Sequence, residues 1–261
     1  MMRIAIPRST TKSLNCQSEY RASSLARYSL WQFRDFVVER GIAILIIGFL
    51  LGYVLIAPLR SLGAQMTGSQ AAPMWGFVLQ IASAIVSLSV LVAVNGIIST
   101  DRKLGYYRFL FSKPVNPLLF YAQLFFVGMV GVLASMLVLS SLLRTVFPTF
   151  SVLHFLLYTT IVYIAMGGIG FFLSVATRFD WLTLAAVWLG SRALRDLYGP
   201  KQDWRSKAVE LLPPVHKLDE VANSLIGTGT AHTTDVLWLL GYGALFFALG
   251  LVALRWRSLA D

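Results

Sequence analysis

The histidines and the acids near them are the first candidates for chemistry in this chain. His154, His216 and His232 are widely spaced, and His216 has an acid at helical spacing, Asp219, three residues later. Such a carboxylate can orient an imidazole or share a metal with it, but a single pair on a polar segment is usually just solvated. The sequence contains no phosphate-binding loop, no GxSxG, no HExxH and no paired cysteines. We therefore expect no catalytic, cofactor-binding or metal-binding residue in this chain.

Three amide side chains lie within otherwise apolar segments: Gln80, Asn95 and Gln123. Polar side chains at membrane depth are costly to bury and often mark a substrate path. They also form hydrogen bonds between helices, which is the more common role. We take the three amides as a candidate substrate path and keep interhelical hydrogen bonding as the favoured alternative.

The elements that position these residues are long apolar segments. Of 261 residues 57% are hydrophobic and 13% are charged, and the mean hydropathy is +0.69. Soluble domains carry about 25% charged residues. The charge-free stretches each hold the roughly 20 residues that cross a bilayer; they are residues 41–59, 61–100, 114–143, 145–177 and 236–254. The sequence predicts an all-α polytopic membrane protein.

We place six spans within one transmembrane domain, residues 41–254. The fifth span has a short apolar core, and Arg192 and Arg195 lie near its end, so an interfacial or re-entrant helix is the alternative there. The predicted spans are 41–58, 75–98, 118–142, 152–175, 181–199 and 236–254.

The distribution of Lys and Arg predicts the orientation of the chain. Seven bases precede span one and four lie between spans two and three. The connection between spans one and two holds only Arg60, and that between spans three and four only Arg144. Because cytoplasmic connections are enriched in bases, we expect both termini, tails 1–23 and 255–261, on the cytoplasmic side of a prokaryotic plasma membrane. The predicted outer loop 200–235, with the end of span five, carries six bases and six acids, which conflicts with this rule.

The charge and the single cysteine limit the other classes of function. The net charge of +10 fits contact with anionic membrane lipid better than with nucleic acid. Cys16 is the only cysteine, so no internal disulfide or paired-cysteine metal site forms. The N-terminus is basic and polar and lacks the apolar core of a cleaved signal.

Residues 24–40 predict an amphipathic helix that lies on the cytoplasmic interface. Leu30, Phe33 and Val37 share one helical face, and Trp31 suits the headgroup zone. The alternative is that the last turn of this helix is an extension of span one.

The connection between spans two and three, residues 99–116, combines an acid, four bases, several aromatics, a glycine and a proline. Thr100 can cap a helix with Asp101 in its first turn. Tyr107 and Phe111 recur at helical spacing, and Pro114 ends the helix. We expect a short helix, residues 100–114, that lies across the membrane surface and can transmit force into two spans.

This connection resembles that of the permease subunits of type-2 ABC transporters. The shared pattern is an acid, a glycine four residues later, a proline nine residues after that, and a small polar residue two further on. Here these are Asp101, Gly105, Pro114 and Asn116. The six spans, the interface helix, the long connection before the last span and the short basic tail also resemble that family.

The resemblance implies a permease, most often an exporter, that pairs with a second copy or a paralogue. Two separate ABC ATPase subunits would bind ATP and Mg²⁺, so this chain would hold no cofactor and catalyse no reaction. Tyr106 stands where Thr is common in that family, and Arg108 stands where an acid is common. These two differences affect which ATPase the connection would fit. The residues implied to contact the ATPase are Asp101, Gly105, Tyr106, Tyr107, Arg108, Phe111 and Pro114.

Two other classes of function stay open on the sequence alone. The chain could be a non-transporting anchor or assembly subunit of a larger complex. Less favoured is an interfacial membrane enzyme that uses His216, Asp219 and Glu220.

Overall fold

The computed structural model describes residues 29–63, 71–98, 101, 116–148, 150–177, 180–198, 213 and 215–256. Every regular element in these ranges is a helix. Four predicted segments lie wholly or largely outside the described residues: the tail 1–23 with the start of the interface helix, the coupling helix after Asp101, most of residues 200–214, and the end of the C-terminal tail.

Most of the long helices lie largely within the charge-free stretches of the sequence, and the helix over residues 180–198 is the exception. Helical residues 29–36 continue through a π-helical turn, η1 (Val37–Gly41), into α2. Two short elements, α10 (Val215–Ala222) and η2 (Asn223–Thr228), precede the last helix. The long helices are α2 (Ile42–Gly63), α3 (Ala71–Val94), α6 (Pro117–Val146), α7 (Val152–Ala176), α8 (Asp180–Tyr198) and α11 (Thr233–Trp256).

Five helices in the described part of the chain are long and apolar enough to cross a membrane. They agree with the predicted class, an all-α protein with several membrane-spanning helices. α8, which covers the predicted fifth span, is not among them, so the count of six remains a prediction. The five segments are Ser29–Tyr53, Gly76–Val94, Pro117–Thr145, Val152–Ala176 and Thr233–Trp256.

Side-chain caps set the start of two of these helices. Asn116 Oδ1 accepts a hydrogen bond of 3.0 Å from the backbone N–H of Leu118, and Pro117 occupies the first turn, where its missing N–H costs nothing. Ser151 Oγ accepts one of 3.4 Å from the N–H of His154 at the start of α7. Each cap contributes about 1 kcal/mol to its helix. Asn116, the last residue of the motif between spans two and three, therefore has a structural role of its own.

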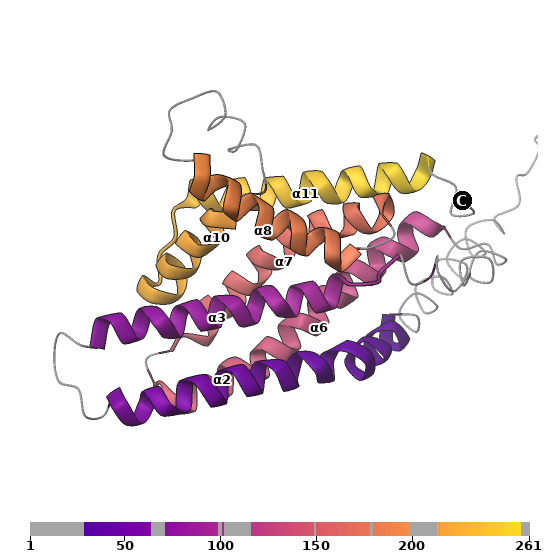
Figure 1. Ribbon diagram of the computed structural model, residues 1–261. Coiled ribbons are helices and arrows are strands. Elements are labelled where there is room, and N and C mark those ends of the chain that lie inside the picture. Colours follow the sequence, from indigo (N-terminus) through magenta and orange to yellow (C-terminus); the bar gives the residue numbers. More distant parts are fainter. Residues whose placement is uncertain are drawn as a thin grey trace, which may run out of the picture.

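α7 is the central helix of the bundle. Its buried residues lie on all of its faces, among them Phe155, Tyr158 and Phe171. α3, α6, α8 and α11 all pack against it (Figure 1). A helix that is apolar all round and buried on every side forms the core of a bundle.

α7 and α11 pack against each other at glycines and run parallel. A Cβ on Gly168 would overlap the carbonyl oxygen of Gly243, and a Cβ on Gly250 would lie 2.7 Å from the Phe171 ring. Near the start of both helices, Gly229, which precedes α11, lies beside His154 in the first turn of α7. Residue numbers therefore rise in the same direction along both helices. The chain that connects the end of α7 to the start of α11 must return along the bundle, and α8 follows that course (Figure 1).

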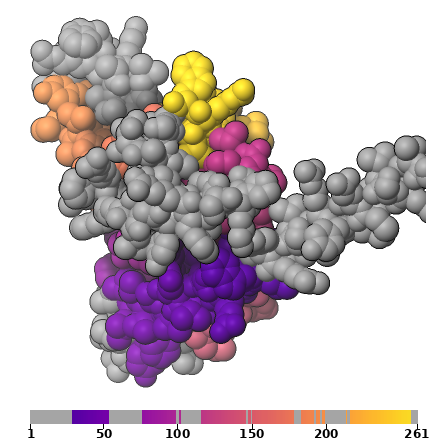
Figure 2. All heavy atoms as spheres, turned by 90° about the vertical axis from the view of Figure 1, so that its right-hand side faces the viewer, coloured from indigo at the N-terminus to yellow at the C-terminus, as the bar shows by residue number. Residues whose placement is uncertain are grey.

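The bundle therefore has two distinct ends. One end, which we call the Asp101 end, contains the start of the N-terminal helix, which is our name for helical residues 29–41. It also contains the C-termini of α3, α7 and α11 and the N-terminus of α6 (Figure 1). Figure 2 faces this end and shows the N-terminal helix in indigo, α6 in magenta and α11 in yellow on one face. The other, the α10 end, holds α10, η2 and the α6–α7 connection (Figure 1).

Substitution of Gly243 by Ala is expected to lower stability by on the order of 2 kcal/mol, because the new methyl group overlaps the backbone of α7 near Ile164. Gly241 is the matched control, since a Cβ there meets nothing within 4 Å and Ala favours the helix by about 1 kcal/mol. Thermal denaturation in detergent should show a lower melting temperature for Gly243→Ala only. Equal effects of the two substitutions would contradict the close contact between the helices.

Candidate functional site

Asp101 is the one predicted ATPase-contact residue that lies in the described part of the chain. The other six lie outside the described residues: Gly105, Tyr106, Tyr107, Arg108, Phe111 and Pro114. Asp101 is therefore the predicted contact residue whose surroundings can be described.

The Asp101 carboxylate is half-buried against the bundle. The Tyr121 hydroxyl of α6 donates a 3.2 Å hydrogen bond to Asp101 Oδ2. Burial raises the pKa of Asp101 above its ordinary value of 3.8, while the Tyr121 hydrogen bond and the charge of Arg40 partly offset that rise. A carboxylate held in this way fixes the start of the connection to α6.

Arg40 joins the N-terminal helix to the end of α3. Its Nη1 donates a 2.6 Å hydrogen bond to the Ala93 carbonyl oxygen. Ala93 lies in the last turn of α3, where carbonyl groups lack partners within the helix, and Gly96 then turns the chain with φ +76°. A cation at a helix C-terminus also interacts favourably with the helix dipole.

Sequence reasoning missed the role of Arg40. It was counted only among the seven bases that precede span one, and its partner carbonyl is 53 residues away in the chain. The one local signal is its position directly before the apolar stretch that begins at Gly41. A base at that depth needs either a polar partner or access to the headgroups.

The N-terminal helix packs closely on α6. The Phe36 ring lies against Gly131 and Gly128. A Cβ on Gly131 would overlap the ring, and a Cβ on Gly128 would lie 3.8 Å from it. About two turns nearer the Asp101 end, Gln123 Nε2 donates a 2.6 Å hydrogen bond to Ser29 Oγ. The two contacts hold the helix at both ends of its described part.

The predicted interface helix and span one form one continuous helix from residue 29, and η1 spans the expected boundary at residue 40. Leu30 is 70% exposed, Trp31 56% and Val37 39%, while Phe33 is partly buried. In a membrane, an exposed apolar face of this kind contacts lipid.

The three amides proposed as a substrate path do not come together. Gln80 is exposed on the half of α3 near the α10 end, and Asn95 is exposed just beyond the other end of that helix. They are roughly 22 Å apart along the helix axis. Gln123 is half-buried and bonded to Ser29, so it joins two helices, as the alternative expects.

His216 lies on α10, away from the Asp101 end. Burial and the nearby charges of Arg195 and Lys217 lower its pKa to about 4. Lys217 Nζ contacts Asp235 Oδ1 at 2.6 Å and so ties α10 to α11. Within the described ranges, no group of three His, Cys, Asp or Glu residues is placed to hold a metal.

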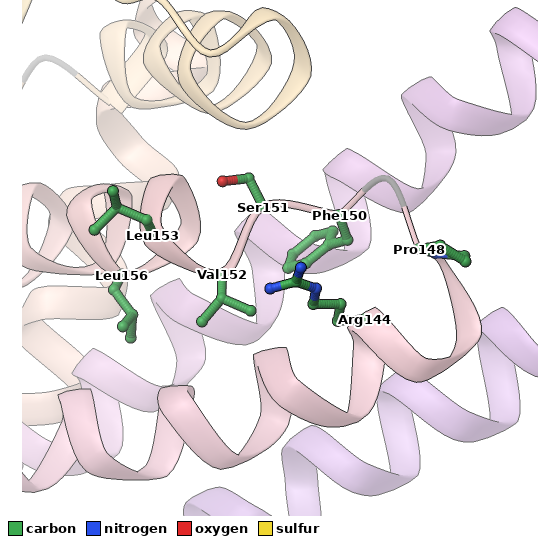
Figure 3. A pocket seen from close by; sticks show the side chains of 7 residues that line it. All are labelled: Arg144, Pro148, Phe150, Ser151, Val152, Leu153 and Leu156. Atoms are coloured by element: carbon green, nitrogen blue, oxygen red, sulfur yellow. The ribbon is translucent and has the colours of Figure 1, made fainter.

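A hollow of about 510 Å³ lies at the α10 end, between the last turn of α6 and the first turns of α7 (Figure 3). Its one charged lining residue is Arg144, and Ser151 supplies a hydroxyl. The remaining residues are apolar, so the described lining lacks the acid–base pair that proton-transfer chemistry needs.

Comparison of the chain with protein-family models, curated proteins and solved structures finds no match. At one end of the bundle, polar contacts link the N-terminal helix to α3 and α6, and α6 to Asp101.

Asp101→Asn is expected to change how stability depends on pH. Folding raises the pKa of Asp101 above 3.8, so its stabilising contribution is complete below that pH and is lost as the pH rises through the folded pKa. The melting temperature of the wild type, measured in detergent from pH 4 to 7, should therefore fall relative to that of the Asn variant. The exposed Glu39→Gln variant is the control, and a constant difference between wild type and Asp101→Asn would contradict the burial of this carboxyl.

Proposed function

We propose that this chain is the permease subunit of an ATP-driven exporter of the type-2 ABC family and that the ATP is hydrolysed on a separate subunit. The observation that carries the proposal is the attachment of Asp101 to the bundle. Asp101 begins the motif that resembles the ATPase-contact helix, and its carboxylate bonds to Tyr121 of α6 beside Arg40. A connection that served only to join two spans would not need such an attachment.

The contacts suggest how a push on the connection would reach the spans. A partner that displaces residues 100–114 would move Asp101, and the Tyr121 hydrogen bond would carry this movement to α6. Arg40 lies close enough to act on the Asp101 carboxylate and also holds the end of α3. One displacement would thus act on the N-terminal helix, α3 and α6 together.

The joint between the N-terminal helix and α2 has features of an element that adopts a second arrangement. The η1 turn, Val37–Gly41, is π-helical, and such turns are frequent at functional sites. Gln32, one turn before it, is buried, and neither of its amide atoms has a hydrogen-bond partner in the described structure. An unpaired buried amide costs about 1–3 kcal/mol, which a shift of this helix could recover.

The helix order supports a sixth crossing. Because α7 and α11 run parallel, the chain between them must traverse the bundle, and α8 has 19 residues, about 28 Å of helix. Six crossings would place both termini on the cytoplasmic side of the plasma membrane with the Asp101 end, where the ATPases would dock. A second copy of the chain, or a paralogue, would complete the transporter.

Gly105→Leu and Asp101→Lys are expected to weaken ATPase binding while the protein still inserts. Leu adds bulk at the docking helix, and Lys reverses the charge at its start. We expect at least about tenfold less ATPase to co-purify with the tagged variants, equivalent to about 1.4 kcal/mol, as measured by quantitative mass spectrometry. Gly241→Ala, on the far helix α11, is the control. Wild-type amounts of ATPase with both variants would show that the docking helix is assigned wrongly.

Cys16 gives a direct test of orientation, because it is the only thiol in the chain. A membrane-impermeant maleimide should leave Cys16 unlabelled in intact cells and label it after lysis. Labelling in intact cells would place the N-terminus outside and reverse the proposed topology.

A further inference from the structure

We propose that the cavity between α3, α8 and α10 binds an amphiphile with an uncharged, hydroxyl-rich head group, such as a glycolipid. This inference rests on the proposed function in one respect: the bound molecule would be the class of substrate that such a permease carries. The binding itself needs no ATPase and can be measured on this chain alone.

The cavity has the size of a ligand site. Its volume is about 460 Å³, within the range of about 300–1,000 Å³ for small-molecule pockets. It lies at the α10 end, where α8 and the α10–η2 segment face α3. Its polar lining comprises Gln80, Ser83 and Ser87 of α3 with Asp219 and Asn223, and its aromatic wall is Trp188 of α8.

Three of these polar residues form a stripe on α3. Gln80, Ser83 and Ser87 are spaced i, i+3 and i+7, which places them on one face of a helix. Ser83 and Ser87 are buried, and Ser83 Oγ lies 2.7 Å from the hydroxyl of Tyr158. Gln80 is exposed at the cavity edge. Polar groups at this depth of an apolar span are costly, and a ligand with hydroxyl groups would give them further partners.

The remaining lining favours a neutral polyol over a phosphate. Asp219 and Asn223 supply oxygen acceptors for hydroxyl donors, and the Trp188 ring offers a flat apolar face with a polar edge. Asp219 is the one charged group in the described lining, and a carboxylate accepts hydrogen bonds from hydroxyl groups, whereas a phosphodiester has no donor to offer it.

Apolar residues on the same cavity give the ligand its tail. Leu79, Ala84 and Leu218 line the cavity beside the polar stripe. On α3, Phe77 is 44% exposed and Leu88 42% exposed, so the cavity is bordered by the surface that faces lipid. A head group held at the stripe would leave its acyl chains in the bilayer.

The test is photo-crosslinking of the full chain, without an ATPase, in phosphatidylcholine nanodiscs that contain a diazirine-bearing monoglucosyl-diacylglycerol. Peptides of α3, α8 or α10 should be labelled. Unlabelled monoglucosyl-diacylglycerol should compete at least tenfold better than diacylglycerol, phosphatidylglycerol or methyl glucoside. Trp188→Ala and the exposed Gln80→Ala should each reduce labelling at least fivefold, whereas Trp238→Ala, an exposed Trp on α11, should not.

Equal competition by diacylglycerol or phosphatidylglycerol would overturn the head-group specificity, and equal competition by methyl glucoside would overturn the need for a tail. Labelling that neither Trp188→Ala nor Gln80→Ala reduces would overturn the site. Specific labelling of a chain that recruits no ATPase would retain this site and reject the permease function. If an ATPase co-purifies with the chain but no labelling is seen, the permease function would be retained and this binding site rejected.

Discussion

The glycine contact between α7 and α11 is the constraint on which the rest of the architecture depends. Lipid tails are as apolar as the side chains, so helices in a membrane gain little from hydrophobic burial against one another and associate through close packing and hydrogen bonds. Gly168 and Gly243 allow two backbones to touch in parallel. Parallel packing requires the intervening chain to return along the bundle, which places α10 and η2 at the end opposite Asp101.

The two sides of the bundle are held by different interactions, and the difference suits a device that moves. α7 and α11 are joined by backbone contact at glycines and by the rings of Phe171 and Phe247, against which Phe125 of α6 also packs. The N-terminal helix packs on α6 through the Phe36 ring and is joined to α3 by the Arg40 hydrogen bond to the Ala93 carbonyl. Two backbones in contact resist sliding, whereas a side-chain contact and a single hydrogen bond can be exchanged, so motion is expected where the N-terminal helix meets α3 and α6.

The sequence predicts the long helices well and their contacts poorly. The predicted spans 152–175 and 236–254 lie within α7 and α11, because absence of charge marks membrane depth and each helix continues to its cap or next polar residue. Helical periodicity does not show which apolar face meets protein and which meets lipid. Leu30 and Val37 were expected to share the apolar face that lies on the membrane, and both are exposed in the structure, where lipid would contact them. Phe36 is instead buried against protein, which the sequence did not predict. Phe36 fits there because Gly128 and Gly131 are three residues apart on α6, a pairing across the fold that one segment cannot reveal.

The proposed transport function depends most on contact between residues 100–114 and an ATPase. The direct measurement is photo-crosslinking in cells from p-benzoylphenylalanine placed at Tyr107, with the same group at Tyr53, which is 63% exposed within the first span, as the control. Cross-linking from position 107, and not from position 53, to one protein that contains a phosphate-binding loop is the predicted result. Cross-links from position 107 to lipid alone, or to proteins without such a loop, would contradict the account.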